Sequence, residues 1–300
     1  MKEPTIRKVE EAMRSLGCQM ENTVTVSKET QPLIVLNIPG IENAFYQEII
    51  RGARVSAKAH GCHLLIHESH LNKGNMLDFC NLLRRVDAAG VILLNRISEE
   101  ALNQIRTIAP LVQCCEYNEH ADYPYVSIDD TRAAEIATEY LLSNGGSKIA
   151  LINGPGNFKY AKRRQEGFMN ALQKAEVMIP KQWIVQLPEV SYEMAYAAVC
   201  RLLNSDSRPN AFFTISDVFA AAVIRAAKRF RLHVPRDILV VGFDNIELSS
   251  MTSPSITTVN QPKFQMGYTA CEMLLELMED PHGEMKSLLL DTELVIREST

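Results

Sequence analysis

Paired cysteines, long apolar runs and an excess of basic residues are all missing from the sequence. The seven cysteines include no C-x-x-C pair, and no spacing of cysteine and histidine fits a zinc site. No apolar run reaches the roughly 18 residues of a membrane span, and no basic-then-apolar signal segment opens the chain. With 31 Lys and Arg against 36 Asp and Glu, the net charge of −5 does not suggest a surface for binding DNA. We therefore expect a cytoplasmic protein in a reducing compartment, with no membrane partner.

Motifs of catalysis and cofactor binding are also missing. There is no G-x-S-x-G, no P-loop and no G-x-G-x-x-G, and Gly154-Pro155-Gly156 only indicates a turn. Four histidines lie close together in the chain, but they alternate between expected helix ends and strands without a metal-binding geometry: His60, His63, His67 and His70. We therefore expect neither an enzyme nor a cofactor or metal.

Apolar runs and amphipathic segments alternate from Pro32 onward. Three hundred residues exceed the usual size of one core, and 46% hydrophobic with 22% charged residues is typical of a globular chain. Strands are predicted at residues 33–36, 64–66, 90–94, 111–115, 125–128, 148–152, 183–186, 211–215, 238–241 and 256–259, and residues 288–296 close the chain. Helices are predicted at residues 44–60, 75–85, 98–107, 160–175, 191–204, 217–231 and 263–279. This alternation predicts an α/β fold of two similar doubly wound parallel-sheet subdomains, with a ligand cleft between them.

The stretch 238–262, ILVVGFDNIELSSMTSPSITTVNQP, contains the first candidate ligand contacts. Asp244 and Gln261 follow its two predicted strands, and ligands of open α/β sheets bind at the carboxyl ends of strands. The Asp244 carboxylate can accept hydrogen bonds, and the Gln261 amide can both donate and accept them. Together they suit a ligand with hydroxyl groups. In the alternative interpretation, Asp244 caps a helix and Gln261 is a solvated loop residue. Spacing alone favours that alternative.

Two further polar residues stand near predicted helix starts. Arg164 lies one turn before Phe168 on an apolar helix face, from which its guanidinium could grip two hydroxyls or a carboxylate in a cleft. The alternative is a solvated arginine within the basic run 162–164. Asp217 follows the strand FFTI and Ser216, and it fits a helix cap as well as a ligand contact.

Several stretches, in order, resemble the LacI (lactose-repressor) family of bacterial transcription regulators over about residues 33–300. They are IENAFYQEIIRGARVSAKAHG, VDAAGVILL, VSIDD, KIALINGP, RRQEGF, PNAFFTISDVFAAAVIRAAK, VVGFDN, SPSITTVNQP and TELVIREST. The resemblance implies a periplasmic-binding-protein-like fold with three crossovers between subdomains. It assigns residues 32–127 and 262–286 to the N-terminal subdomain, and residues 128–261 and 287–300 to the C-terminal one. Within the family, Glu116-Tyr117 together with GFDNIEL is most similar to the cytidine-repressor branch.

The resemblance also assigns roles to residues at the cleft. RRQEGF resembles the family's R-x-x-G-[FWY], in which Arg164 would grip the effector. Asn43-Ala44-Phe45-Tyr46 resembles the family's N-P-F-F, which directs Phe45 or Tyr46 toward the cleft, although Phe45 is equally suited to the core. Glu116 follows a predicted strand, and from there it could accept a hydrogen bond from a ligand hydroxyl or amino group.

The first 31 residues resemble what remains of a DNA-binding headpiece, followed by a linker. A helix is predicted at residues 5–16, with Thr5 as N-cap and Gly17 as its end, and it is similar to the last helix of the family's headpiece. The preceding helix-turn-helix is absent from these 300 residues, through truncation or natural variation. Residues 18–31 are β-branched at 23–26 and carry Lys28 as their only cation, which disfavours a DNA-contacting hinge helix.

Taken together, these features predict the effector-sensing, dimerising module of a LacI-family regulator. A small sugar or nucleoside in the cleft would control operator DNA binding in a homodimer, through a headpiece largely absent from this chain. The alternative is the solute-binding protein of a sugar or nucleoside transporter, which has the same two-subdomain architecture. An enzyme is a third class, for which the sequence shows no constellation of residues.

Overall fold

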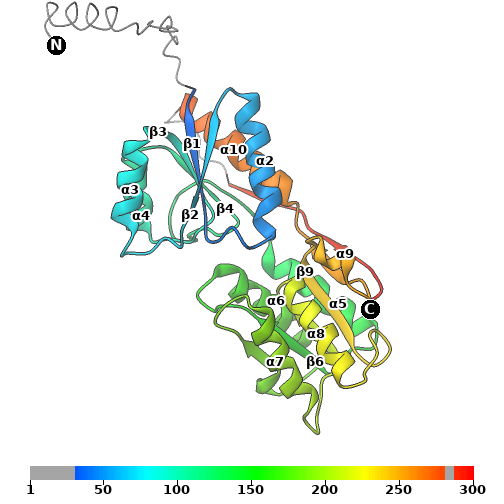
Figure 1. Ribbon diagram of the computed structural model, residues 1–300. Helices are drawn as coiled ribbons and strands as arrows, with labels where there is room; N and C mark the ends of the chain where they lie inside the picture. Colours follow the sequence, from blue (N-terminus) through cyan, green and yellow to red (C-terminus); the bar gives the residue numbers. More distant parts are fainter. Residues whose placement is uncertain (1–30, 281–286) are drawn as a thin grey trace, which may run out of the picture. The chain divides into compact units, whose positions relative to one another are not determined.

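A computed structural model of the chain describes residues 31–280 and 287–300, which form two six-stranded sheets covered by helices (Figure 1). Residues 33–300 make one compact unit. The helix predicted at residues 5–16 lies outside the described residues, as does the linker except for its last residue. Among the helices of the described residues, none is long and apolar enough to cross a membrane.

The first sheet is entirely parallel, in the strand order β11-β5-β4-β3-β1-β2. Its strands are β1 (Leu33–Ile38), β2 (His63–Glu68), β3 (Ala88–Leu93), β4 (Leu111–Cys114), β5 (Tyr125–Ile128) and β11 (Leu288–Leu290). Its helices are α2 (Phe45–Ala59), α3 (Met76–Arg85), α4 (Glu99–Arg106) and α10 (Lys263–Glu279). A parallel sheet buried on both faces needs nearly continuous apolar strands, as β1 illustrates with its sequence LIVLNI.

Helices cover both faces of this sheet, with α3 and α4 on one face and α2 and α10 on the other (Figure 1). Alternate residues of β1 therefore join different cores. Val35 packs into the cluster that includes Phe79 of α3, whereas Ile34 and Leu36 belong to the cluster that includes Ile49 of α2. This is the doubly wound arrangement that the sequence predicted.

The second sheet has the strand order β12-β10-β9-β8-β6-β7, and only the pairing of β12 with β10 is antiparallel among its described strands. Its strands are β6 (Ile149–Asn153), β7 (Ile184–Gln186), β8 (Ala211–Thr214), β9 (Leu239–Asp244), β10 (Thr257–Asn260) and β12 (Glu293–Val295). Its helices are α5 (Asp130–Ser143), α6 (Lys159–Lys174), the 3-10 turn η1 (Lys181–Trp183), α7 (Tyr192–Leu203), α8 (Asp217–Arg229) and α9 (Leu248–Met251).

Within the described residues the chain passes three times between the sheets, after β5, after β10 and after β11. The third passage differs from the prediction. The closing segment 288–296 contains two strands: β11 pairs with β5 in the first sheet, and β12 pairs with β10 in the second. The chain therefore crosses at residues 291–292, and residues 288–290 join the first sheet rather than the C-terminal subdomain assigned to 287–300. The boundary at 287 came from the resemblance to the family, and no local pattern in residues 288–296 shows which sheet each part joins.

Candidate functional site

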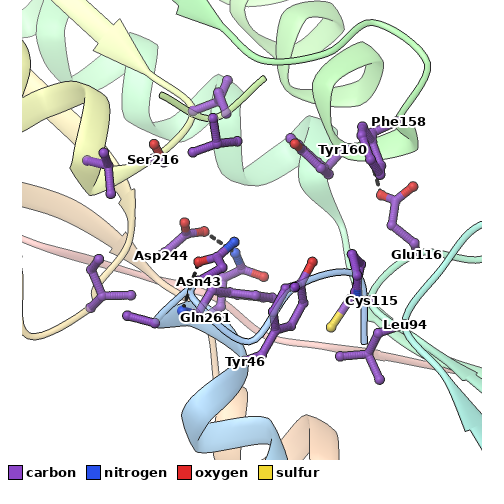
Figure 2. Close-up of a pocket in the computed structure, with 18 of the residues that line it drawn as sticks. Asn43, Tyr46, Leu94, Cys115, Glu116, Phe158, Tyr160, Ser216, Asp244 and Gln261 are labelled. Atoms are coloured by element: carbon purple, nitrogen blue, oxygen red, sulfur yellow. Dashed lines mark hydrogen bonds between the residues drawn. The ribbon is translucent and has the colours of Figure 1, made fainter. Parts of the chain in front are cut away.

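A cavity of about 760 Å³ lies where strands of both sheets end (Figure 2). Seven of the eight predicted site residues line it: Asn43, Phe45, Tyr46, Glu116, Arg164, Asp244 and Gln261. Figure 2 shows Asn43, Asp244 and Gln261 grouped together, while Glu116, Phe158 and Tyr160 form another group. The cavity lies at the carboxyl ends of parallel strands, where ligand sites of α/β folds are found, and its volume is typical of a small-molecule site.

Arg164 of α6 is buried at the centre of the polar side, with 5% of the residue exposed. Its Nε donates to Asp130 Oδ1 at 2.9 Å, its Nη1 donates to the Ile215 carbonyl at 2.7 Å, and Nη1 lies 3.5 Å from Asp244 Oδ1. The guanidinium also lies over the Phe243 ring, with Cζ 3.6 Å from the centroid. Two carboxylates and an aromatic face therefore hold the fork in place. The alternative of a solvated arginine is wrong.

The close approach of α6 to α5 brings Arg164 beside Asp130, and Gly167 makes this approach possible. A Cβ at Gly167 would lie 2.0 Å from the carbonyl oxygen of Thr131 on α5, so no other residue fits here without moving a helix. The glycine of the motif R-x-x-G-F thus has a packing role, which places the arginine one turn earlier in the cavity wall.

Asp244 and Gln261 lie side by side, as two neighbouring parallel strands that end at one edge require. Gln261 is 3% exposed, and its Nε2 donates to Asp244 Oδ1 at 2.6 Å. Asp244 has a backbone φ of 101°, a left-handed value that is uncommon outside glycine and is often found at functional sites. Burial raises the pKa of Asp244, while the charges of Arg164 and Lys263 act against that shift. The alternative favoured by spacing is wrong, since α9 begins after Glu247 and Gln261 is buried.

Glu116 is buried in the cavity wall, directly beyond the end of β4. Its Oε2 accepts a hydrogen bond from the backbone N–H of Lys159 at 2.9 Å, and its Oε1 accepts one from the N–H of Tyr160 at 3.0 Å. These are the first two N–H groups of α6, so a carboxylate from a distant loop caps this helix. Burial raises the pKa of Glu116, whereas the charge of Lys159 and the two backbone hydrogen bonds oppose the shift.

The ion pair of Asp130 and Lys159 was missed as part of the site by the sequence prediction. Lys159 Nζ lies 2.7 Å from Asp130 Oδ2, and both residues are at most 4% exposed. Burial alone would raise the pKa of Asp130, but the charges of Lys159 and Arg164 outweigh it and lower the pKa. One sequence signal was available: a lysine at the first position of a helix opposes the helix dipole and therefore suggests an acidic partner.

Aromatic side chains also line the cavity. Phe45 and Tyr46 both line the cavity and meet edge to face, with centroids 5.4 Å apart and planes at 73°. Phe45 also packs against the apolar core, so the alternatives of core and cleft both apply to it. Phe158 and Tyr160 stack with centroids 5.4 Å apart. Burial raises the pKa of both tyrosines, Tyr46 and Tyr160, which keeps their hydroxyls neutral.

Asp217 is the predicted site residue that does not line the cavity. The helix cap at this junction is Ser216, whose hydroxyl accepts from the Phe219 N–H at 3.3 Å. Asp217 is fully buried and accepts from Thr258 Oγ1 at 2.6 Å and from the Ile246 N–H at 2.8 Å. Burial, and then the charge of Asp244, raise the pKa of Asp217 to about 8. Asp217 is therefore neither the cap nor a wall of the cavity, and the prediction of a ligand contact there is corrected.

The lining of the cavity is rich in carboxylates. Its acidic members are Glu42, Glu116, Asp130, Glu189 and Asp244. Among the described lining residues Arg164 is the only lysine or arginine. Across residues 31–280 and 287–300, no group of three or more His, Cys, Asp or Glu side chains could hold a metal ion. Such a cavity can hold a ligand that donates hydrogen bonds on one side and offers an apolar face on the other.

Comparison with known proteins agrees with this arrangement. Residues 138–300 match the family of periplasmic binding protein-like domains. The HTH-type transcriptional repressor CytR of Escherichia coli (strain K12) is 33% identical over 300 residues, covering 99% of this chain and 87% of the repressor. A putative transcriptional regulator LacI from Bacillus cereus subsp. cytotoxis superposes with a TM-score of 0.83 at 25% identity, covering 90% and 99% of the two chains. A LacI-family regulator from Enterococcus faecium with bound ribose has a TM-score of 0.79 at 25% identity, covering 89% and 98%.

The two sheets and the cavity at their strand ends define a periplasmic-binding-protein-like core. The chain belongs to the LacI family of transcription regulators, of which it contains the effector-binding core. These relatives are regulators rather than enzymes, and they support an effector-sensing module over the solute-binding protein of a transporter.

Proposed function

We propose that this protein senses a small sugar or nucleoside in the cavity and, as a homodimer in the cytoplasm, uses that binding to control its affinity for operator DNA. The buried guanidinium of Arg164, held between Asp130 and Asp244 with Gln261 beside them, is the observation that carries the proposal. Fixed donors and acceptors of this kind match the hydroxyl groups of a sugar ring. The ribose bound to the Enterococcus faecium regulator supports the same class of ligand.

The cavity can transmit binding because elements of both sheets contribute to its wall. Tyr46 and Glu116 come from segments that follow strands of the first sheet, whereas Arg164 and Asp244 belong to elements of the second. A ligand that touches both sets binds one arrangement of the two sheets more tightly than another. It therefore shifts the equilibrium between them by its difference in affinity.

The kinship with transcription regulators supports the proposed dimerisation and control of DNA binding. The relatives include helix-turn-helix repressors, and symmetric dimers of such proteins bind two half-sites of an operator. Ile66 on β2 and Leu77 on α3 are exposed apolar side chains of the first sheet and its helices, which suits an interface in this part of the molecule.

The test is a thermal-shift screen of the whole chain against monosaccharides, disaccharides and nucleosides. A ligand at 100 times its Kd should add about 2.7 kcal/mol to the stability of the protein. Arg164→Ala should abolish that shift, whereas Arg163→Ala should keep it, because Arg163 is an exposed neighbour paired with Glu119 and Glu166. If no compound stabilises the protein, or if both variants respond like the wild type, the proposed site is wrong. Analytical ultracentrifugation measures the oligomeric state. A chain that remains a monomer at micromolar concentration contradicts the proposed homodimer.

A further inference from the structure

The wall of the cavity is unevenly charged, and the imbalance bears on what the cavity can bind. Five carboxylate residues line it, against Arg164 as the sole lysine or arginine of the described lining. Ligands with hydroxyl or amino groups bring donors to these acceptors. A phosphate or carboxylate group of a ligand would bring further acceptors and negative charge to a wall in which carboxylates already outnumber cations.

The charge of Arg164 is already matched within the protein. Its Nε donates to Asp130 at 2.9 Å, and its Nη1 lies 3.5 Å from Asp244. The ammonium of Lys159, a buried cation outside the lining, lies 2.7 Å from Asp130 as well. Lys263 donates to the carbonyl oxygens of Asp244 and Asn245. Each of these cations has oxygen partners that an anionic ligand would have to displace.

The N-terminus of α6 is one of the helix ends at this wall where an anion could otherwise fit. Helix N-termini attract phosphate because their first N–H groups have no partner within the helix. In this protein both oxygens of the Glu116 carboxylate accept the N–H groups of Lys159 and Tyr160, and Glu116 is 5% exposed. A protein carboxylate thus occupies the N–H groups that a phosphate at this helix end would need.

We infer that the effector carries no anionic group, and that Glu116 is the residue that excludes phosphorylated forms of it. The inference rests on the proposed function, because it narrows the ligand class of the same cavity to uncharged or cationic compounds rich in hydroxyl groups. Glu116 excludes anions in two ways, through its own negative charge and through its occupation of the helix N–H groups. The cell could then distinguish a free sugar or nucleoside from its phosphate ester by this one carboxylate.

The test compares neutral probes with their phosphate esters by titration calorimetry on the whole chain. The pairs are ribose with ribose 5-phosphate and cytidine with cytidine 5′-monophosphate, supplemented by the phosphate ester of any neutral compound that the screen finds. We expect each phosphate ester to bind on the order of 100-fold more weakly than its neutral partner, since like charges in a buried site strongly oppose binding. A penalty below about tenfold, or tighter binding of the ester, overturns the inference while the proposed function stands. If neither member of any pair binds, the proposed function fails and the inference fails with it.

Two variants assign the effect to Glu116. Glu116→Gln should reduce the phosphate penalty by about tenfold, because the amide no longer repels the ester. Glu119→Gln removes the same charge from a residue outside the cavity lining, which pairs with Arg163 at 3.1 Å, and it should leave the penalty unchanged. Equal penalties in all three proteins overturn the role of Glu116. Should Glu116→Gln fail to fold, the wild-type ratio between neutral and phosphorylated probes still tests the exclusion of anions.

Discussion

In the second sheet, the junctions that follow β8 and β9 each carry an aspartate. The two aspartates lie in different surroundings and have different partners. Asp217 is fully buried and accepts hydrogen bonds from Thr258 and from the backbone of Ile246. Asp244 faces the cavity, lies 3.5 Å from Arg164 and accepts from Gln261. Asp217 therefore stabilises the junction after β9 from a buried position, whereas Asp244 presents its carboxylate to the cavity.

The direction of the side chain, rather than its position along the strand, separates the two roles. Gly242 lies directly against Asp217, and a Cβ at Gly242 would lie 2.4 Å from Asp217 Oδ1. The glycine makes room for the buried carboxylate, and the left-handed backbone at Asp244 then turns the second carboxylate toward Arg164. One aspartate should govern stability and the other affinity, and the predictions below test that separation.

Removal of Arg164 should have the largest effect on stability. Arg164 is an ion-pair partner of Asp244. Arg164→Ala leaves Asp130 and Asp244 with less compensation in a buried site, and we expect a loss of about 3–5 kcal/mol in the free energy of unfolding. Urea denaturation measures it. Arg163→Ala, at an exposed position on the same helix, should change stability by less than about 0.5 kcal/mol. Equal midpoints for Arg164→Ala and the wild type would show that the buried guanidinium is not needed for stability.

Asp217→Ala should destabilise the protein by about 2–3 kcal/mol, because it leaves the Thr258 hydroxyl and the Ile246 N–H buried without an acceptor. Asp244→Ala should cost only about 1 kcal/mol, since its neighbours line a cavity that water can enter. Affinity for the effector should follow the opposite order, with a loss of more than tenfold for Asp244→Ala and little change for Asp217→Ala. The two measurements are urea denaturation and calorimetric titration. If both variants lose affinity and stability in the same proportion, the separation of roles is wrong.

The raised pKa of Asp217, about 8, predicts that stability depends on pH. The unfolded chain releases this proton near pH 4, so between pH 4 and pH 8 the folded state binds more protons and its stability falls as pH rises. Between pH 6 and pH 8 the loss should reach about 2 kcal/mol. Asp217→Asn cannot titrate and should remove this part of the slope, as urea denaturation at several pH values would show. An unchanged slope in Asp217→Asn would assign the dependence to other groups.

Substitution of Gln261 should have the smallest of these effects on affinity. Gln261 donates a hydrogen bond to Asp244, so its loss tests the role of Asp244 separately from that of Asp217. Gln261→Ala removes one hydrogen bond to the Asp244 carboxylate, worth about 1 kcal/mol, which corresponds to roughly fivefold in affinity. Calorimetric titration of the effector measures it. In the background of Asp244→Ala, the same change should have almost no further effect, since the shared hydrogen bond is already gone. Full additivity would mean that Gln261 acts on the ligand independently of Asp244.

Much of the site could be predicted because the position of a residue relative to the predicted strands and helices indicates whether it lies near the cavity. Asn43, Asp244 and Gln261 stand at or just beyond the ends of strands, and the carboxyl ends of parallel strands gather at one edge whatever the details of packing. Arg164 was indicated by the apolar face around it and by the resemblance to the family's motif. The same reasoning placed Asp217 in the cavity, because position along the chain does not reveal on which side of a strand end a side chain points.

Other features could not be predicted because they depend on contacts between segments far apart in sequence. Glu116 reaches the N-terminus of α6 more than 40 residues later, and the partner of Lys159 is Asp130 on a different helix. The two strands of the closing segment, β11 and β12, lie in different sheets. No local pattern encodes which of several strands or helices becomes the neighbour.

The sequence by itself determined the α/β class, the alternation of strands and helices, the family, and the segments that meet at the cavity. The class, the alternation and the segments at the cavity follow from hydrophobic periodicity and strand-end positions, which are local properties of the chain. The family follows from the resemblance of the sequence motifs. Only the tertiary structure decided which carboxylate faces the cavity, which one stabilises a junction, and which one caps α6. Those roles depend on side-chain direction and on partners supplied by other elements, and both are set only when the helices and sheets pack together.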